Sequence, residues 1–238
     1  MADTLRIMAE AFAPFGAVRL DEAAEAIVVT REGQEETVFF AQNLHGMLQR
    51  AETGAERDQI LDDFLAGYSE SHDARRDNLM IAVRHRDYAA FVPTPAPVWA
   101  LAGDLVVFVM VDNARSLAVA SDEALAELNL TEDQAYDLGA AHLARMAVEA
   151  GQEGEDILML TLPDASYVSS LMALPSFWVP YQIRFSRVVV SPLARDVLLV
   201  VDGARPEMVA ELRALGERHW DRMDYPLTRN LFVLGPDG

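Results

Sequence analysis

Four charged residues stand where predicted strands end or turn, and the two arginines among them suit the binding of an anionic ligand. Arg84 and Asp112 each end a predicted strand, and Arg195-Asp196 lies at the turn before another. A guanidinium can clamp a carboxylate or phosphate through two parallel hydrogen bonds. An Arg-Asp pair can equally orient a turn or bond to a sheet edge. The sequence therefore leaves a ligand site and a structural ion pair open at these positions.

Aromatic residues form the second candidate site. The segment Phe177-Trp178-Val179-Pro180-Tyr181 lies between two predicted elements. In an exposed loop, Trp178 and Tyr181 would be an interaction hot spot, because Trp and Tyr dominate such sites. If they are buried, the same residues are a lid on the core. The sequence does not decide between these alternatives.

Catalytic motifs are incomplete. His85-Arg86-Asp87 matches part of a kinase catalytic loop, but the Leu and downstream Asn of that motif are missing. The serines that follow Asp164 lack both Gly-x-Ser-x-Gly and Ser-x-x-Lys, so we expect Asp164 to cap a helix with Ser166 in its first turn. The five histidines lack helical zinc spacing. We therefore predict no cofactor and no metal site of local spacing, and the sequence leaves open a metal site assembled from distant residues.

Two residue types are missing from the 238-residue chain. It has no cysteine, which excludes disulfides, thiol catalysis and thiolate metal sites. All 19 basic residues are arginine. The lack of lysine excludes Schiff-base chemistry, the P-loop lysine and the kinase strand lysine.

The chain is strongly acidic, with a formal net charge of −19. Such a surface repels nucleic-acid phosphates and anionic membranes, so we expect neither as a partner. A protein partner, in particular a basic one, fits this charge. No segment has the length of a transmembrane helix, and residues 1–13 lack the basic start and long apolar core of a signal peptide. We expect a cytoplasmic protein of undetermined oligomeric state.

Apolar patterning predicts an α+β fold. Three units read as a hairpin followed by a helix, and they begin near residues 26, 104 and 188. In the first unit, residues 31–34 are the expected turn. Thr131 and Gln134 form a capping-box pattern at the start of a helix. This order predicts antiparallel or mixed sheets with helices mainly on one face, and not a doubly wound α/β sheet.

A proline-rich stretch suggests how the chain is divided. Residues 93–97 read Pro-Thr-Pro-Ala-Pro, which cannot be regular helix or central strand. We therefore predict an N-terminal α+β lobe over residues 1–92 and a C-terminal α+β lobe over residues 93–238. The small size of the first lobe also allows one continuous domain.

The order of several short motifs resembles the YtpQ-like family of uncharacterised bacterial proteins, a family of unknown function. The motifs are residues 40–44 (FAQNL), 79–84 (LMIAVR), 103–112 (GDLVVFVMVD), 119–125 (VASDEAL), 130–135 (LTEDQA), 164–166 (DAS) and 191–198 (SPLARDVL). His142-Leu143 departs from the Asn-Leu expected in the family. The resemblance implies a fold and a bacterial cytoplasmic origin, and it implies no activity.

Two functions follow as hypotheses. The first is a non-enzymatic protein-interaction or regulatory module, based on the missing catalytic motifs, the acidity and the aromatic segment. The second is a small-molecule-binding enzyme, hydrolase-like, with a cleft lined by Arg84, Asp112, Arg195 and Asp196. Convergence of these four side chains favours the second hypothesis, and an exposed apolar patch around Trp178 favours the first.

Overall fold

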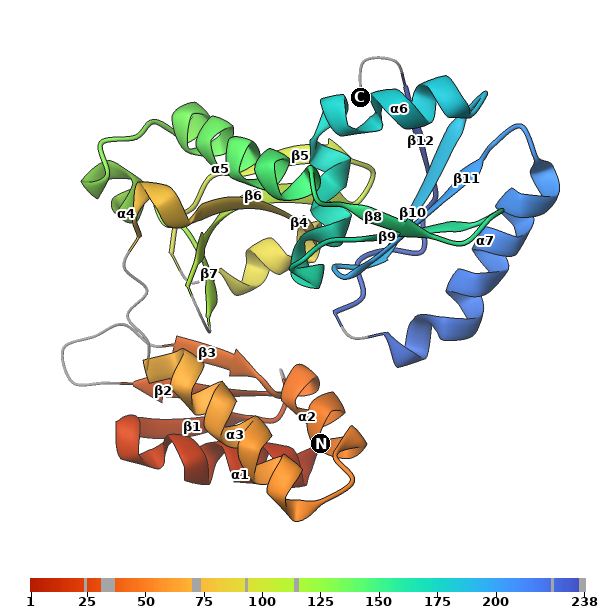
Figure 1. Cartoon of the computed structure of the whole chain (residues 1–238). Coiled ribbons are helices and arrows are strands. Elements are labelled where there is room, and N and C mark those ends of the chain that lie inside the picture. Colours follow the sequence, from red (N-terminus) through yellow and green to blue (C-terminus); the bar gives the residue numbers. More distant parts are fainter. Residues whose placement is uncertain are drawn as a thin grey trace. The chain divides into compact units, whose positions relative to one another are not determined.

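The computed structural model describes residues 1–23, 25–30, 37–69, 74–92, 94–113, 116–223 and 225–235. The predicted turn at 31–34, His72 and Pro93 lie outside these ranges. The chain divides into two compact units (Figure 1), namely Met1–His72 with Asn113–Ser116, and Asp73–Asp112 with Leu117–Gly238. The first boundary between the two units along the chain, at 72/73, lies twenty residues before the predicted boundary at 92/93. The cause is that the strand beginning at Leu79 pairs with the strand ending at Asp112.

The first unit packs three helices and a short 3-10 helix with a three-stranded antiparallel sheet. Its elements are α1 (Ala2–Phe12), η1 (Ala13–Phe15), β1 (Ala17–Asp21), β2 (Ala26–Thr30), β3 (Thr37–Phe40), α2 (Ala41–Arg50) and α3 (Gly54–Ser69). The sheet order is β1-β2-β3. Met8 and Phe12 of α1 pack against Ile27 and Val29 of β2 in one core, because residues four apart share a helix face and alternate residues share a strand face.

The second unit begins with a sheet in which β6 is the central strand. The elements are η2 (Arg76–Asn78), β4 (Leu79–His85), η3 (Arg86–Phe91), β5 (Val98–Ala102), β6 (Leu105–Asp112), β7 (Leu117–Val119), α4 (Asp122–Glu127) and α5 (Glu132–Ala147). Strands β4, β5 and β7 all pair antiparallel with β6. The predicted capping box of α5 is present, with Gln134 N–H donating to Thr131 Oγ1 over 3.3 Å and Thr131 N–H to Gln134 Oε1 over 3.0 Å.

A five-stranded antiparallel sheet completes the second unit, in the order β12-β10-β11-β9-β8. The elements are β8 (Gly151–Glu153), β9 (Leu158–Thr161), η4 (Ala165–Ala173), α6 (Pro175–Arg184), β10 (Val188–Ala194), β11 (Val197–Asp202), α7 (Pro206–His219), η5 (Trp220–Arg222) and β12 (Phe232–Leu234). Helix α7 covers the face that carries Val189 and Val201. The opposite face, with Val190 and Val200, belongs to the core that the two sheets share.

The predicted α+β class with antiparallel sheets is confirmed. Each expected hairpin-then-helix unit is present, as β2-β3 before α2, β6-β7 before α4, and β10-β11 before α7. Strands β1, β5 and β8 were not predicted, because they are short and carry few buried side chains. Among the described residues, no helix has the length and apolar character needed to cross a membrane.

Helix α5 lies unusually close to β4, and Gly139 makes this approach possible. A Cβ atom at Gly139 would lie 2.9 Å from the backbone carbon of Met80. We expect Gly139→Ala to lower the free energy of unfolding by about 1–3 kcal/mol, because backbone cannot yield as a flexible side chain does. Urea unfolding measures this. Gly54→Ala is the control, since nothing lies within 4 Å of a Cβ there. Equal stability of the two variants would contradict the close approach.

Candidate functional site

Two buried serines of η4 bring the ends of β4 and β10 together. The backbone N–H of Val83 donates to Ser170 Oγ over 3.0 Å. The backbone N–H of Ser169 donates to the carbonyl of Arg195 over 3.0 Å, and Ser169 Oγ donates to the carbonyl of Ala194. Ser169 and Ser170, which are adjacent in η4, thus bond to the backbone of Val83, the neighbour of Arg84, and to the backbone of Arg195. Two arginines 111 positions apart in the chain are thereby placed in one region.

Arg84 is the most unusual charged residue of the region. Only 7% of its surface is exposed. Its Nη1 donates to the carbonyl of Val83 over 2.8 Å, and its guanidinium lies 5.9 Å from the centre of the Tyr88 ring. Within the described ranges, no carboxylate lies at ion-pair distance from it. Burial lowers the pKa of Arg84, and the positive charge of Arg195 lowers it further.

Arg195 is held by an aromatic ring rather than by an acid. Its guanidinium stacks on Tyr225, 3.4 Å from the ring centre. The Arg195 backbone N–H donates to the Tyr225 carbonyl over 3.2 Å, which fixes the two residues side by side. Tyr225 adopts a left-handed backbone conformation, with φ of 51°. Stacking occupies a face of the guanidinium and leaves the N–H groups at its edge for an acceptor.

The predicted acids behave differently from each other. Asp112 lies near the buried hydroxyl of Tyr167. Burial raises the pKa of Asp112, the Tyr167 hydroxyl opposes this rise, and the charge of Asp164 adds to it. Burial and the charge of Asp112 in turn raise the pKa of Tyr167. Asp196, by contrast, is exposed at the β10-β11 turn. The structure therefore brings the chain at Arg84 and the backbone of Arg195 into one region, places Asp112 near Tyr167, and leaves Asp196 exposed at a turn.

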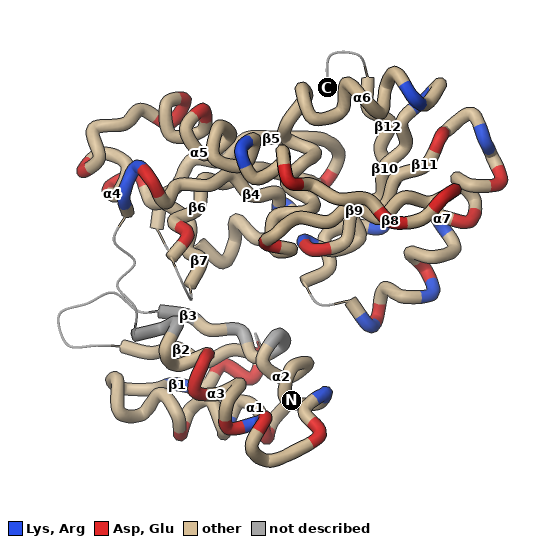
Figure 2. The backbone as a smooth tube through the Cα atoms, in the orientation of Figure 1, with Lys and Arg blue, Asp and Glu red and all other residues tan. Residues whose placement is uncertain are grey.

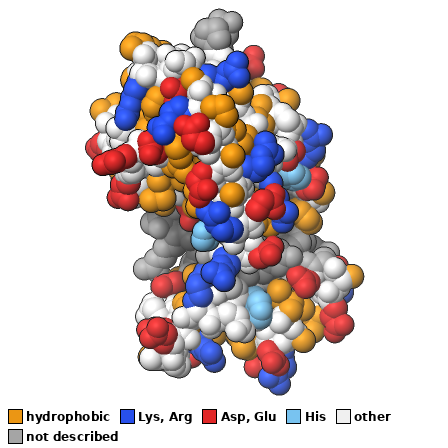
Figure 3. All heavy atoms as spheres, turned by 90° about the vertical axis from the view of Figure 1, so that its right-hand side faces the viewer, with side chains coloured by type: hydrophobic (Ala, Val, Ile, Leu, Met, Phe, Trp, Pro, Cys, Tyr) orange, Lys and Arg blue, Asp and Glu red, His pale blue; other side chains and the backbone are white. Residues whose placement is uncertain are grey.

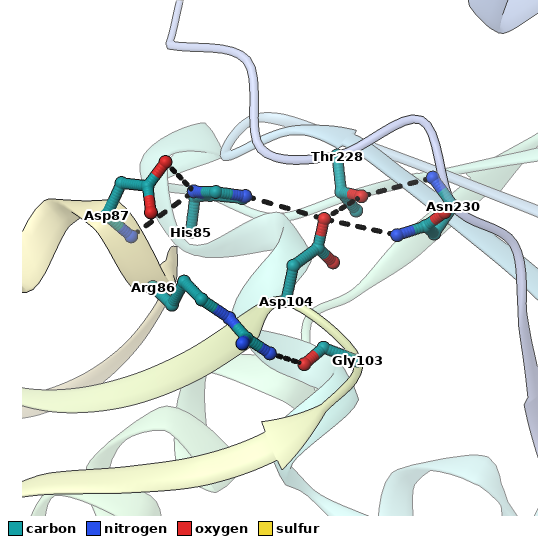
Figure 4. Close-up of polar contacts among 7 residues, drawn as sticks. All are labelled: His85, Arg86, Asp87, Gly103, Asp104, Thr228 and Asn230. Atoms are coloured by element: carbon teal, nitrogen blue, oxygen red, sulfur yellow. Dashed lines mark hydrogen bonds and ion pairs between the residues drawn. The ribbon is translucent and has the colours of Figure 1, made fainter.

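A polar network lies beside this cluster, at the end of β4 (Figure 4). Asp104 Oδ2 accepts hydrogen bonds from Thr228 Oγ1 over 2.8 Å and from Asn230 Nδ2 over 3.1 Å. His85 Nε2 lies 3.4 Å from the same oxygen. The backbone N–H of Asp87 donates to His85 Nδ1 over 3.2 Å, so the proton of the neutral imidazole is assigned to Nε2.

This network is suited to anchoring rather than to proton transfer. Each ring nitrogen of His85 faces a protein group, Asp104 on one side and Asp87 on the other. Neither nitrogen is directed toward an open position where a substrate could exchange a proton. Thr228 and Asn230 belong to the segment that also carries Tyr225. The network therefore holds residues 225–230 against the β5-β6 turn. Tyr225 in this segment carries the ring that stacks on Arg195.

The aromatic candidate is a lid on the core, and the exposed-loop alternative is wrong for Trp178. The predicted segment is part of helix α6, in which Trp178 is 1% exposed. The Trp178 indole N–H donates to the carbonyl of Leu171 over 2.9 Å. Tyr181 is half-buried, and its ring centre lies 5.4 Å from that of Trp178. Pro180 lies inside this helix, although proline usually interrupts a helix interior.

Asp164 and Ser166 form the predicted helix cap. The N–H and the hydroxyl of Ser166 both donate to Asp164 Oδ1, over 2.9 and 2.6 Å. Asp164 thus opens the 3-10 helix η4, which continues through Ser169 and Ser170. The serines that follow Asp164 therefore have structural hydrogen-bonding roles here.

A surface hollow of 530 Å³ lies elsewhere in the second unit and involves none of the predicted site residues. It is lined by Asp122, Leu125, Ala126, Leu130, Thr131, Glu132 and Asp133, at the starts of α4 and α5. In the part of the chain that the structure describes, no three His, Asp or Glu side chains gather in a group that could hold a metal ion.

Comparison with known proteins found no match, whether against protein-family models, curated proteins or solved structures. The geometry therefore carries the functional argument. Sequence reasoning missed Tyr88, Tyr167 and Tyr225 around the arginines, and it missed Asp104 with its partners. Tyr88 follows Arg84 closely, and Asp104 directly precedes a strong strand, but Tyr225 had no signal that linked it to Arg195.

Asp104 should make a stabilising contribution that depends on pH. Burial alone would raise its pKa, but the hydrogen bonds from Thr228 and Asn230 outweigh this and lower the pKa below its ordinary value of 3.8. Because the pKa of Asp104 is lower in the folded protein than its ordinary value of 3.8, the ionised carboxylate stabilises the folded state above pH 3.8. This stabilisation is lost as the pH falls through the folded-state pKa. We expect Asp104→Asn to lower the unfolding free energy at pH 7 by about 1–2 kcal/mol, and this difference should shrink in acid.

Denaturant unfolding at a series of pH values measures this difference. Asp87→Asn is the control, because the Asp87 side chain is 77% exposed and should contribute little. A difference between wild type and Asp104→Asn that stays constant from neutral pH into the acid range would contradict the assigned role.

Proposed function

We propose that the second unit is a small-molecule-binding domain that receives an anionic ligand between Arg84 and Arg195. One observation carries the proposal. The Arg84 guanidinium is buried, it donates a hydrogen bond to the neighbouring Val83 carbonyl, and no carboxylate in the described structure pairs with it. A buried charge without a counter-charge is costly, and folded proteins retain such groups mainly where function requires them. An anionic ligand would supply the counter-charge.

The surroundings favour local recognition over general attraction of anions. Acidic positions are spread over both units (Figure 2), in keeping with the net charge of −19. On the face shown in Figure 3, arginine and acidic side chains are interspersed. Long-range forces therefore do not draw anions to the protein. An anion would be bound through short, directional contacts with the two guanidinium groups.

The contacts of Arg84 and Arg195 support ligand binding. The hydrolase-like activity that the sequence analysis suggested is a separate hypothesis. Asp112 and Tyr167 are the neighbours that could take part in proton transfer, since their raised pKa values keep both groups protonated to higher pH than usual. Their role as ligand-contacting groups is part of the proposal. Membership of the YtpQ-like family and a cytoplasmic location also stay proposals.

Replacing Arg84 with methionine should separate binding from stability. Methionine has similar length without charge, so Arg84→Met removes the desolvation cost of the guanidinium. We expect a gain of about 0.5–2 kcal/mol in the unfolding free energy of the free protein. Arg213→Met on the exposed side of α7 is the control and should change it by less than about 0.5 kcal/mol. A loss of more than about 1 kcal/mol in Arg84→Met would show that the guanidinium is a structural anchor.

Binding itself is measured by thermal unfolding with added anions at constant ionic strength. A ligand that binds the folded state stabilises it by about 2.7 kcal/mol at a concentration 100 times Kd. Wild type should be stabilised by an oxyanion relative to chloride, and Arg84→Met should lose that effect. Equal stabilisation of both proteins would place the anion elsewhere and reject the proposed site.

Protein binding is the second candidate function, and helix α6 is the observation that favours it. Val179 and Ile183 lie one turn apart on α6 and are 49% and 82% exposed. Exposed apolar side chains at this spacing suit a helix face that contacts a partner. The net charge of the chain favours a basic partner.

Ile183→Asp tests this candidate without disturbing the core. An affinity pull-down should recover a partner in stoichiometric amount with wild type and lose it with Ile183→Asp, because the charge would be buried in the interface. Ser176→Asp, which adds the same charge at an exposed position of α6, should retain the partner. Retention of the partner by both variants would reject α6 as the interface.

A further inference from the structure

We propose that His85 is a proton-operated switch that sets the conformation at the start of η3. His85 is the N-cap residue of this 3-10 helix, and its Nδ1 accepts the backbone N–H of Asp87 over 3.2 Å (Figure 4). An imidazole nitrogen accepts a hydrogen bond only while it carries no proton. The cap therefore exists only while His85 is neutral. The switch does not require an anion at Arg84.

A partner for the protonated ring lies in the same residue as the capped amide. Asp87 Oδ2 lies 3.3 Å from His85 Nδ1. When Nδ1 takes up a proton it becomes a donor, so it exchanges the Asp87 N–H for the Asp87 carboxylate. On the other side of the ring, Nε2 carries its proton in both states and lies 3.4 Å from Asp104 Oδ2. Protonation thus replaces one contact of the ring and adds charge to the other.

The charged groups that face His85 come from two elements. Asp87 belongs to η3, and Asp104 belongs to the β5-β6 turn. The neighbouring Arg86 directs its guanidinium to the Gly103 carbonyl. The His85 side chain is partly exposed, so protons reach it from solvent. Histidine is the side chain that ordinarily changes charge between pH 5 and 8, so we expect the exchange of partners in this range.

Tyr88 is the residue that this exchange affects next. It directly follows Asp87 in η3, and its ring centre lies 5.5 Å from that of the buried Phe108 and 5.9 Å from the Arg84 guanidinium. A 3-10 helix of six residues has few hydrogen bonds, and their geometry is poorer than in an α-helix. Release of the Asp87 N–H therefore loosens the turn that holds Tyr88 beside Arg84.

Nuclear magnetic resonance of the ¹⁵N-labelled full chain tests the switch. The scalar coupling between the Asp87 amide nitrogen and His85 Nδ1 reports their hydrogen bond directly. We expect this coupling at pH 8 and its loss at pH 5.5, with shifts of the amide signals of residues 88–91 over the same range. His142 is the internal control. Its Nδ1 lies 2.6 Å from the Leu79 carbonyl and so carries a proton in both states, and this bond should persist.

His85→Asn separates the cap from the titration. The asparagine side chain can accept the Asp87 N–H at every pH, so the pH-dependent shifts of residues 88–91 should be lost. A proton on His85 Nδ1 at pH 8, or no coupling there, overturns the proposal. So do shifts confined to His85 and Asp87, and shifts of residues 88–91 that persist in His85→Asn. If His85→Asn does not fold, the coupling and the amide shifts of the wild type still decide.

Discussion

The buried pair Ser169-Ser170 in η4 is the contact on which the rest of the second unit depends. Its hydroxyl and amide groups bond to the backbone of β4 on one side and of β10 on the other. Buried hydroxyls need such partners, because an unpaired polar group in a core costs free energy. The same bonds that satisfy the serines set the distance between two sheets, and hence between the arginines that follow Val83 and Ala194.

Charge placement in this unit follows two different rules. Arg205, Arg218 and Arg229 lie at the surface and pair with acids there, contacts that solvent screens and that contribute little. Arg84 and Arg195 instead contact tyrosine rings in a protein with twice as many acidic as basic residues. With so many acids available, pairing these two with carboxylates would be easy. Their contacts with rings leave both cations without a carboxylate partner in the described structure, which is why we interpret them as candidates for a binding site.

The segment that carries Tyr225 links the anchoring network to the arginine cluster. Thr228 and Asn230 bond to Asp104, and the backbone of Tyr225 and Leu227 bonds to the end of β10. The segment is therefore held from both sheets. Because the ring of Tyr225 stacks on Arg195, the network at Asp104 supports the position of Arg195 from a distance.

The sequence by itself determined the fold class, the three hairpin-then-helix units and the caps at Thr131 and Asp164, because these depend on local periodicity and short-range hydrogen bonds. It also marked Arg84, Asp112 and Arg195 as strand-end charges. Only the tertiary structure decided that Arg84 and Arg195 share one region, that Asp196 does not, and that Trp178 is buried. Those outcomes depend on η4 bridging two sheets, a contact between residues far apart in the chain that no local pattern records.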